Sequence, residues 1–504
     1  MLKLFNASKS RLSSISRNIS ALSKSQQGGE VVKVQDKDDA IKSISKKPTR
    51  LPLVKNFFLG KIDTELIPYP EVLYENDYLD IVNQRKKFYE DFLETNVFSN
   101  PDNVNNLAKL KEIGAFRSNS MLFTEACYSV SEPEAKFLSY STFLRNHHQV
   151  YRILSDFANE NQKSDLLPRL DSGELFGTPC LFEKTSFKNN KHLMMCRATY
   201  KDSKEVWMVN GEKSFIVMSP TDKDSSLFLV FVSTESKNFI GDYEESIRVC
   251  VIEGNTPGIT ISRPDETLGF DEKTLSQVTV TFQDVEIPDS AFLVEKDVQD
   301  QRIIPTLMSY LRLDKGVQAM ADQNVDVESA MVQAYAIETM TDFIVRPLHV
   351  VGPEAVIKTF EFEKLLRDAS QIAASAETLD GIRHFLAMSG LQYAGVYLNE
   401  DVKKQRNPFA NPGFMFSRYL GESSIEHPKL KYKFEHFVHP SLVTAGVAVE
   451  ASISRLGDAV DILLGRHGSL IVEHTVEVNK IGEAATLCYA MFASIARASR
   501  SYCI

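Results

Sequence analysis

The sequence has no long uninterrupted apolar run, which argues against a membrane-spanning helix. A membrane-spanning helix needs roughly 18 consecutive apolar residues, whereas the densest run, Leu227 to Val232, has the length of one strand. Cysteine is scarce as well, with 6 residues far apart in the chain and no C-x-x-C pair. We therefore predict buried free thiols in a reducing compartment and neither disulfides nor a zinc site.

Basic residues and glycine are too few for two further classes of protein. Lys and Arg number 57 against 67 for Asp and Glu, and the resulting net charge of −10 excludes a general nucleic-acid-binding surface. The 23 glycines and 19 prolines lie below the usual frequencies of roughly 7% and 5%, which argues against many glycine-rich phosphate loops. With 504 residues, 43% of them hydrophobic, the chain is predicted to form several globular domains.

The first 29 residues differ in composition from the rest of the chain. They contain no Asp or Glu, are rich in serine, and alternate basic with apolar residues. This composition is typical of a mitochondrial transit peptide, and a disordered basic tail is the alternative. Residues up to about Arg50, rich in Lys and Asp, are interpreted as a linker to the folded part.

The spacing of apolar residues changes twice along the chain. It predicts helices in residues 56–168, strands in 170–293, and helices again in 303–398, followed by a last helical segment, Leu442 to Arg500. The predicted N-terminal helices are Tyr78–Phe98, Leu107–Ile113 and Ala135–Phe157. The predicted strands are Leu193–Tyr200, Val206–Val209, Ser226–Val232, Ile247–Ile252, Gly258–Ser262 and Ser276–Phe282. Asn210-Gly211 is interpreted as a turn between strands.

Short motifs at the joints of these regions carry a family resemblance. Val206 to Ile216 resembles the strand, Asn-Gly turn and strand in the β-domain of acyl-CoA dehydrogenases, and Leu167 to Glu174, Phe282 to Pro288 and Phe362 to Asp368 resemble that family in the same order. Four further segments are similar to its very-long-chain branch: Phe58–Ile62, Pro68–Val72, Ser389–Gly395 and Val438–Leu442. They are closest to acyl-CoA dehydrogenase family member nine, a sub-branch known for respiratory complex I assembly as well as for enzyme activity.

The resemblance implies an α+β fold with an N-terminal α-helical domain, a central β-barrel-like domain, a shortened C-terminal helical bundle and a helical C-terminal extension. The predicted boundaries are 1–50 for transit peptide and linker, 51–169 for the helical domain, 170–293 for the β-domain, 294–400 for the bundle, 401–441 for a connector and 442–504 for the extension.

The family's chemistry needs a carboxylate to remove an α-proton from the acyl thioester and a flavin, FAD, to take hydride from the β-carbon. At the position of the base this sequence has Ala376, and Glu377 replaces the following glycine. One step along a helix turns a side chain by about 100°. Glu377 is therefore either a base presented by a shifted loop or an ordinary exposed carboxylate, and the second interpretation is favoured.

The loop that contacts flavin in the family also differs from the family's pattern in this sequence. The loop from Phe182 to Asn189 has Phe182 for the family's threonine and Phe187 for its glycine, where close approach to the cofactor is needed. The resemblance assigns cofactor binding to Phe215, Ile216, Ser186 and Gly352. Phe215 could equally fill the core, and Val217 replaces a hydrogen-bonding residue.

The bundle carries two further departures. The family's pyrophosphate-binding arginine segment has no counterpart after Arg312, as if a helical hairpin were missing, and the adenosine loop becomes His349 to Ala355 with only Gly352 retained. FAD is thus implied by family, with its binding in doubt. No metal site is predicted, because His436 and His439 lack further placed ligands.

Two functions remain open. The favoured one is a catalytically impaired mitochondrial member acting as a scaffold or assembly factor, with complex I assembly suggested by resemblance. The alternative is an active long- or very-long-chain acyl-CoA dehydrogenase that forms trans-2-enoyl-CoA and passes electrons to electron-transferring flavoprotein. Mitochondrial assembly proteins or that flavoprotein are the expected partners, acyl-CoA and a homodimer are possible, and the matrix side of the inner membrane is the expected location.

The connector is the expected membrane contact. Lys403, Lys404 and Arg406 precede five large apolar residues: Phe409, Phe414, Met415, Phe416 and Tyr419. Such a grouping suits adsorption to an anionic membrane surface. The competing interpretation is a loop whose apolar residues cover the bundle.

Overall fold

The computed structural model describes residues 52–64, 105–112, 115–116, 138–184, 194–218, 223–237, 243–262, 276–293, 326–357, 378–421, 428 and 430–503, with isolated positions at 307 and between 362 and 373. The predicted transit peptide, the predicted helix Tyr78–Phe98 and Arg312 lie outside these residues. The chain divides into two compact units. Unit 1 comprises residues 1–39, 78–320 and 344–375, and unit 2 comprises residues 40–77, 321–343 and 376–504.

Unit 1 is built on one mixed sheet. Its strands are β1 (Phe176–Cys180), β2 (Arg197–Lys201), β3 (Val206–Met218), β4 (Ser226–Lys237), β5 (Tyr243–Glu253), β6 (Ile259–Ile261) and β7 (Ser276–Ile287). They follow the order β1-β4-β2-β3-β7-β6, and β5 pairs with β4. β4 runs parallel to β1 and β2 on one edge and antiparallel to β5 on the other. The sequence missed β1, whose Gly and Pro residues resemble a loop.

The densest apolar run of the sequence is the centre of this sheet. Leu227 to Val232 lie within β4, and all six side chains are fully buried. Phe228, Val230 and Val232 point into the barrel-like core, and the intervening residues face a second core. Because β4 is covered on both faces, its sequence shows no polar alternation.

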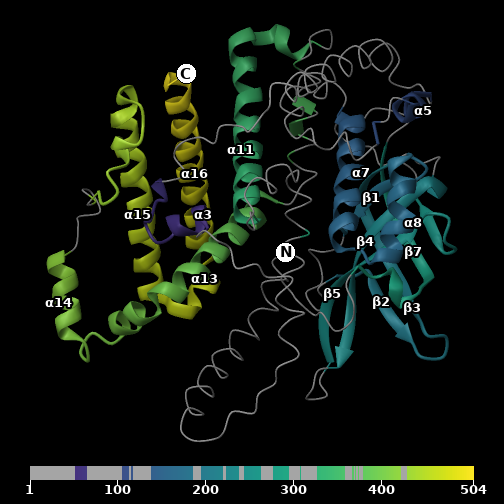
Figure 1. Cartoon of the computed structure of the whole chain (residues 1–504), viewed down its shortest axis with the longest axis horizontal. Coiled ribbons are helices and arrows are strands. Elements are labelled where there is room, and N and C mark those ends of the chain that lie inside the picture. Colours follow the sequence, from purple (N-terminus) through teal and green to yellow (C-terminus); the bar gives the residue numbers. More distant parts are fainter. Residues whose placement is uncertain are drawn as a thin grey trace, which may run out of the picture. The chain divides into compact units, whose positions relative to one another are not determined.

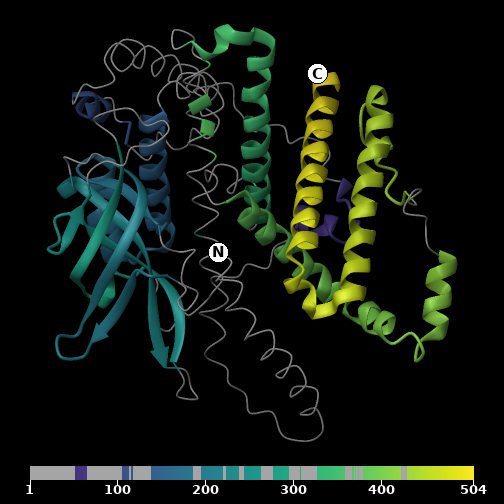
Figure 2. The ribbon, with the colours of Figure 1, turned by 180° about the vertical axis from the view of Figure 1, so that it is seen from behind.

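Helices α7 (Leu138–Phe157) and α8 (Glu160–Asp171) cover the second face of the sheet, as Figures 1 and 2 show. α7 contributes Val150, Ile153 and Leu154, whose spacing of three and four residues forms one apolar stripe. A capping box at Asn159 begins α8, since the Asn159 side chain accepts from Gln162 N at 2.9 Å and the Gln162 side chain accepts from Asn159 N at 3.0 Å. α5 (Asn105–Glu112) agrees with the predicted helix Leu107–Ile113.

The prediction of a turn at Asn210-Gly211 is wrong. β3 continues through both residues for 13 positions, and its pairing with β7 shifts register between Val209 and Gly211. The Asn210 side chain accepts from Asp284 N at 2.8 Å, which fastens the bulge to the end of β7. Gly211 is required here because an added Cβ would lie 2.5 Å from Cys196 Cα. Close packing against Cys196, the residue before β2, therefore explains the glycine that resembled a turn signal.

Unit 2 is helical. It contains α3 (Leu53–Phe57), residues 326–343 of α11 (Asp326–Val351), α13 (Leu379–Arg406), α14 (Pro412–Gly421), α15 (Val443–His467) and α16 (Thr475–Cys503). The 3-10 turn η9 (Gly468–Glu473) divides the predicted last helical segment into α15 and α16. In Figure 1 the short α3 lies among α13, α15 and α16, and its contacts with all three agree. No helix in the described part of the chain is long and apolar enough to cross a membrane.

The described cysteines confirm the prediction of buried free thiols. Cys180, Cys196, Cys250 and Cys488 are all buried and unpaired. Burial raises the pKa of the Cys196 and Cys488 thiols to about 11. These groups therefore remain protonated at neutral pH and serve as small core residues.

Candidate functional site

The candidate site is the part of the unit 1 sheet where the loop after β1 meets β3. The Ser214 N–H donates to Phe182 O at 2.8 Å and so holds the loop on the strand. Thr279 of β7 donates its hydroxyl to Ser214 Oγ at 3.2 Å from the other side. These contacts position the segment that the family resemblance associates with flavin.

Phe215 projects from this segment. Its φ of +62° lies in the left-handed region that residues other than glycine rarely adopt, and the residue is 46% exposed. The neighbours Ser214 and Ile216 are each 2% exposed. A register shift between Lys213 and Ile216 produces this bulge and turns the single ring outward. The alternative that Phe215 fills the core is therefore wrong, and an outward ring in a strained backbone is a feature of functional sites.

Two positions before Phe215, Lys213 forms a fully buried ion pair that was not predicted from the sequence. Lys213 Nζ donates to Glu183 Oε1 at 2.8 Å, and the side chains are 0% and 4% exposed. Glu183 also accepts from the N–H groups of Met195 at 2.8 Å and Cys196 at 3.0 Å. Lys213 donates further to Leu181 O at 3.2 Å. The desolvated charges are thus extensively hydrogen-bonded, which a buried pair requires.

The other predicted site residues are placed as follows. Ile216 packs in the barrel-like core, and Val217 is 5% exposed on β3. Gly352 follows α11 with φ +74°, and an added Cβ there would meet no atom within 4 Å. Ser186, Phe187, Ala376 and Glu377 lie outside the described residues.

The described residues do not fit FAD in the way the family's loops do. The Val217 side chain has no donor for the flavin edge, and the Ser214 N–H is already bonded to Phe182 O. The Phe215 ring alone offers a platform for a planar ligand. No reaction step is therefore assigned to a flavin at these residues.

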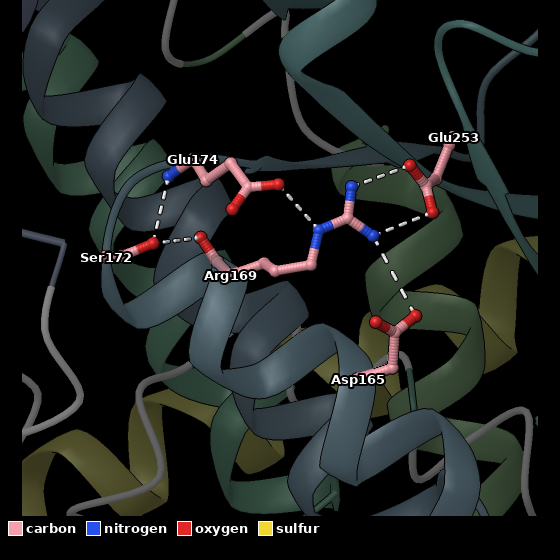
Figure 3. Close-up of polar contacts among 5 residues, drawn as sticks. All are labelled: Asp165, Arg169, Ser172, Glu174 and Glu253. Carbon is pink, nitrogen blue, oxygen red and sulfur yellow. Dashed lines mark hydrogen bonds and ion pairs between the residues drawn. The ribbon is translucent and has the colours of Figure 1, made fainter.

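A second polar cluster fastens α8 to β5. Arg169 donates two bonds to Glu253, at 2.9 and 2.8 Å, and one to Glu174 at 2.8 Å, with Asp165 at 3.8 Å (Figure 3). The hydrogen bonds that Arg169 donates to Glu253 are the main cause that raises the pKa of the Arg169 guanidinium. These hydrogen bonds hold the segment Leu167–Glu174, which we interpret from the sequence as the entry to the β-domain. The role of Arg169 is therefore structural.

Two buried histidines join α7 to the turn that follows α5. Gly177 N donates to His147 Nδ1 at 3.1 Å, so His147 is neutral and donates from Nε2 to Phe116 O at 3.2 Å. His148 Nε2 lies 3.0 Å from Ala115 O. Burial lowers the pKa of His147 to about 3 and that of His148 to about 4.

Of the two C-terminal histidines considered as metal ligands, His439 is engaged otherwise. His439 Nδ1 accepts from Ser441 N at 3.2 Å, and its ring stacks on Tyr502 at 4.9 Å between centroids. Within the described ranges, no group of three or more His, Cys, Asp or Glu side chains is arranged to hold a metal ion.

Comparison with solved structures identifies the fold class first. An acyl-CoA dehydrogenase complexed with FAD from Bacillus anthracis matches with a TM-score of 0.64 at 13% identity, covering 88% of this chain and 85% of that chain. The fold is therefore that of the acyl-CoA dehydrogenases.

Sequence comparisons agree with the fold. The family model of the acyl-CoA dehydrogenase middle domain matches residues 185–285, and that of the ACAD9/ACADV C-terminal domain matches residues 440–504. The human very long-chain specific acyl-CoA dehydrogenase, mitochondrial, is 22% identical over 94% of this chain and 84% of its own length. Isobutyryl-CoA dehydrogenase of Dictyostelium discoideum is 27% identical over 35% of this chain and 38% of its own. The chain is therefore similar to acyl-CoA dehydrogenases in fold and in sequence, with very-long-chain relatives at low identity.

Proposed function

We propose that this protein is a catalytically impaired member of the family that acts in mitochondria as a scaffold, with respiratory complex I assembly as the role that the sequence resemblance suggests. One observation carries the proposal: the buried core of the β-domain is complete, while the residues expected to act as catalytic base and as flavin hydrogen-bond donor are apolar. The buried Lys213–Glu183 pair and the two-sided core of β4 are complete. Ala376 stands where the catalytic carboxylate is expected, and Val217 where a flavin donor is expected.

The experiment that tests this proposal uses the purified full chain and its single tryptophan, Trp207, which is buried in the β-domain core. The protein is incubated with FAD, freed of excess cofactor, and examined by absorption between 350 and 500 nm, roughly the range of flavin absorption. The expected protein is colourless, and Trp207 emission is unchanged. Stoichiometric bound flavin together with quenched Trp207 emission would overturn the proposal that the protein is catalytically impaired.

An active dehydrogenase is the second candidate, and Phe215 is the observation that favours it. Its outward ring and left-handed backbone are typical of a residue that binds a ligand. In that case FAD would accept hydride, Glu377 would serve as the base, and electron-transferring flavoprotein would be the electron acceptor. Formation of trans-2-enoyl-CoA from a long-chain acyl-CoA would decide in favour of this candidate.

We further propose that the connector adsorbs to the matrix face of the inner membrane. Phe409 is 99% exposed and Phe416 65% exposed, which argues against the alternative that these two rings cover the bundle. Lys403 and Lys404 are paired with Glu400 at 3.4 Å and Asp401 at 3.7 Å, contacts that exposed side chains give up at low cost. Arg406 differs, because its guanidinium packs closely against Gly468.

A further inference from the structure

The N-terminal segment of unit 2, residues 52–62, is deeply embedded among helices from the other end of the chain. Four of its apolar side chains are at most 6% exposed: Val54, Phe57, Phe58 and Ile62. The helix within it, α3, has 5 residues, far fewer than the roughly 12 to 15 that an isolated helix needs. The surrounding groove therefore imposes the conformation of this segment.

The helices α13, α15 and α16 each contact the segment. Tyr393 of α13 donates to Asn56 Oδ1 at 3.1 Å, although the two residues are 337 positions apart. The ring of Phe57 lies 5.7 Å from that of Phe492 on α16. On α15, a Cβ added to Gly457 would lie 2.4 Å from Gly60 N, so the two backbones touch. A polar anchor, an aromatic contact and a backbone contact thus surround the segment.

The ring of Phe58 occupies a socket on α13. A Cβ added to Gly390 would lie 2.2 Å from two atoms of this ring, and the ring itself is 0% exposed. Gly395, on the same helix, has no atom within 4 Å of the corresponding position. The socket is therefore a local shape for one aromatic side chain and not a general property of α13.

We propose that the groove formed by α13, α15 and α16 is a peptide-binding site whose ligand is the chain's own segment Pro52–Ile62, bound as a separable ligand. The ligand class is a short helical peptide with Asn-Phe-Phe followed by glycine two positions later. Recognition of this kind, in which a short helix places its anchors in an apolar groove, recurs in protein–peptide complexes. The inference does not depend on flavin or acyl-CoA.

The covalent tether conceals this binding in the intact chain. A tethered ligand is present at an effective concentration in the millimolar range, so added peptide competes poorly with it. A cut in the chain removes this advantage and leaves only the contacts themselves.

The experiment uses the full chain with a specific protease site inserted after Asp77, where the first long stretch of unit 2 ends. After cleavage, the fragment ending there is expected to co-elute with the remainder on size exclusion. A fluorescent synthetic peptide of residues 52–64 is expected to exchange into the groove, measured by anisotropy. Immediate release of the fragment together with no peptide binding would overturn the proposal.

Gly390→Ala and Gly395→Ala are the matched variants, because both add the same methyl group to the same helix. Peptide affinity is expected to fall at least about tenfold for Gly390→Ala and to stay within about twofold for Gly395→Ala, since only the former meets Phe58. Helical circular dichroism checks that both variants fold. Equal affinity for the two would contradict the proposed socket.

An altered peptide gives an independent arm if Gly390→Ala does not fold. A peptide carrying Asn56→Ala loses the bond from Tyr393 and is expected to bind the wild-type cleaved chain several-fold more weakly. Undiminished binding of this peptide, together with undiminished binding of a Phe58→Ala peptide, would show that the groove does not read the sequence of the segment.

Discussion

Lys213 Nζ lies 2.8 Å from Glu183 Oε1 in the interior of the β-domain, and the exposed fraction of neither side chain exceeds 4%. The pair joins the loop after β1 to the strand that carries Phe215. A buried charge that loses its partner is strongly destabilising, whereas a pair replaced as a whole costs far less. Comparing single and double substitutions of this pair therefore tests whether the ion pair stabilises the fold.

Lys213→Met is expected to lower the free energy of unfolding by about 3–5 kcal/mol, because it leaves the Glu183 carboxylate buried without its cation. Lys213→Met combined with Glu183→Gln should recover part of that loss. Urea unfolding followed by Trp207 fluorescence reports the β-domain directly, since Trp207 is the chain's single tryptophan. A double variant as unstable as the single one would contradict the ion-pair account.

Acid should destabilise unit 1 through its buried histidines. The folded pKa values of about 3 for His147 and about 4 for His148 lie below the ordinary 6.5. The stability is therefore complete above pH 6.5 and falls as the pH drops toward 4, by up to about 1.4 kcal/mol per pH unit for each group. Trp207 fluorescence in urea at several pH values measures this slope.

His147→Gln is the matched control for the acid prediction. A glutamine amide can donate to Phe116 O and accept from Gly177 N, as the imidazole does, but does not titrate in this range. The variant should keep most of its stability at pH 7 and show about half the slope between pH 6.5 and 4. An unchanged slope would mean that other groups govern acid unfolding.

Arg169→Lys should weaken the attachment of α8 to β5 even though the charge is conserved. A lysine ammonium cannot make the two parallel bonds that Arg169 makes to Glu253. We expect a loss of about 1–2 kcal/mol in thermal or urea unfolding. Lys163→Ala, which removes an exposed pair with Glu160, serves as control and should change stability by less than about 0.5 kcal/mol.

Dehydrogenase activity should be absent and not readily restored. With FAD and a long-chain acyl-CoA, dye reduction is expected to stay at background, because Ala376 carries no acid-base group. Ala376→Glu combined with Glu377→Gly should also fail, since Phe182, Phe187 and Val217 remain. Activity gained by this pair of changes alone would show that the flavin site is functional.

Charge reversal on the connector should release the protein from anionic vesicles. Lys403→Glu with Lys404→Glu is expected to reduce sedimentation with cardiolipin-containing vesicles at low salt at least about tenfold, because each cation contributes about 1 kcal/mol near the surface. Arg406 is left unchanged, since it packs against Gly468. Binding that is indifferent to salt and to both substitutions would exclude an electrostatic contact.

Periodicity predicted many elements because it records the burial of one residue relative to its near neighbours. The helices ending at Phe157 and the strands at Ser226 and Ser276 follow from local patterns of this kind. The turn predicted at Asn210-Gly211 is wrong, because the glycine is required by close contact with the backbone of Cys196 and not by a turn. β1 was missed, since a short strand containing Gly and Pro has no alternating pattern.

The sequence by itself determined which chemical groups are present: Ala376 at the position where the family resemblance expects the base, the two-sided apolar run of β4, and the outline of an α+β fold. Only the tertiary structure decided that Phe215 points outward, that Lys213 meets Glu183, and that residues 52–62 pack among helices far along the chain. These relationships join residues from 30 to more than 300 positions apart. Local spacing carries no record of such contacts, because they arise only when separate elements pack around a shared core.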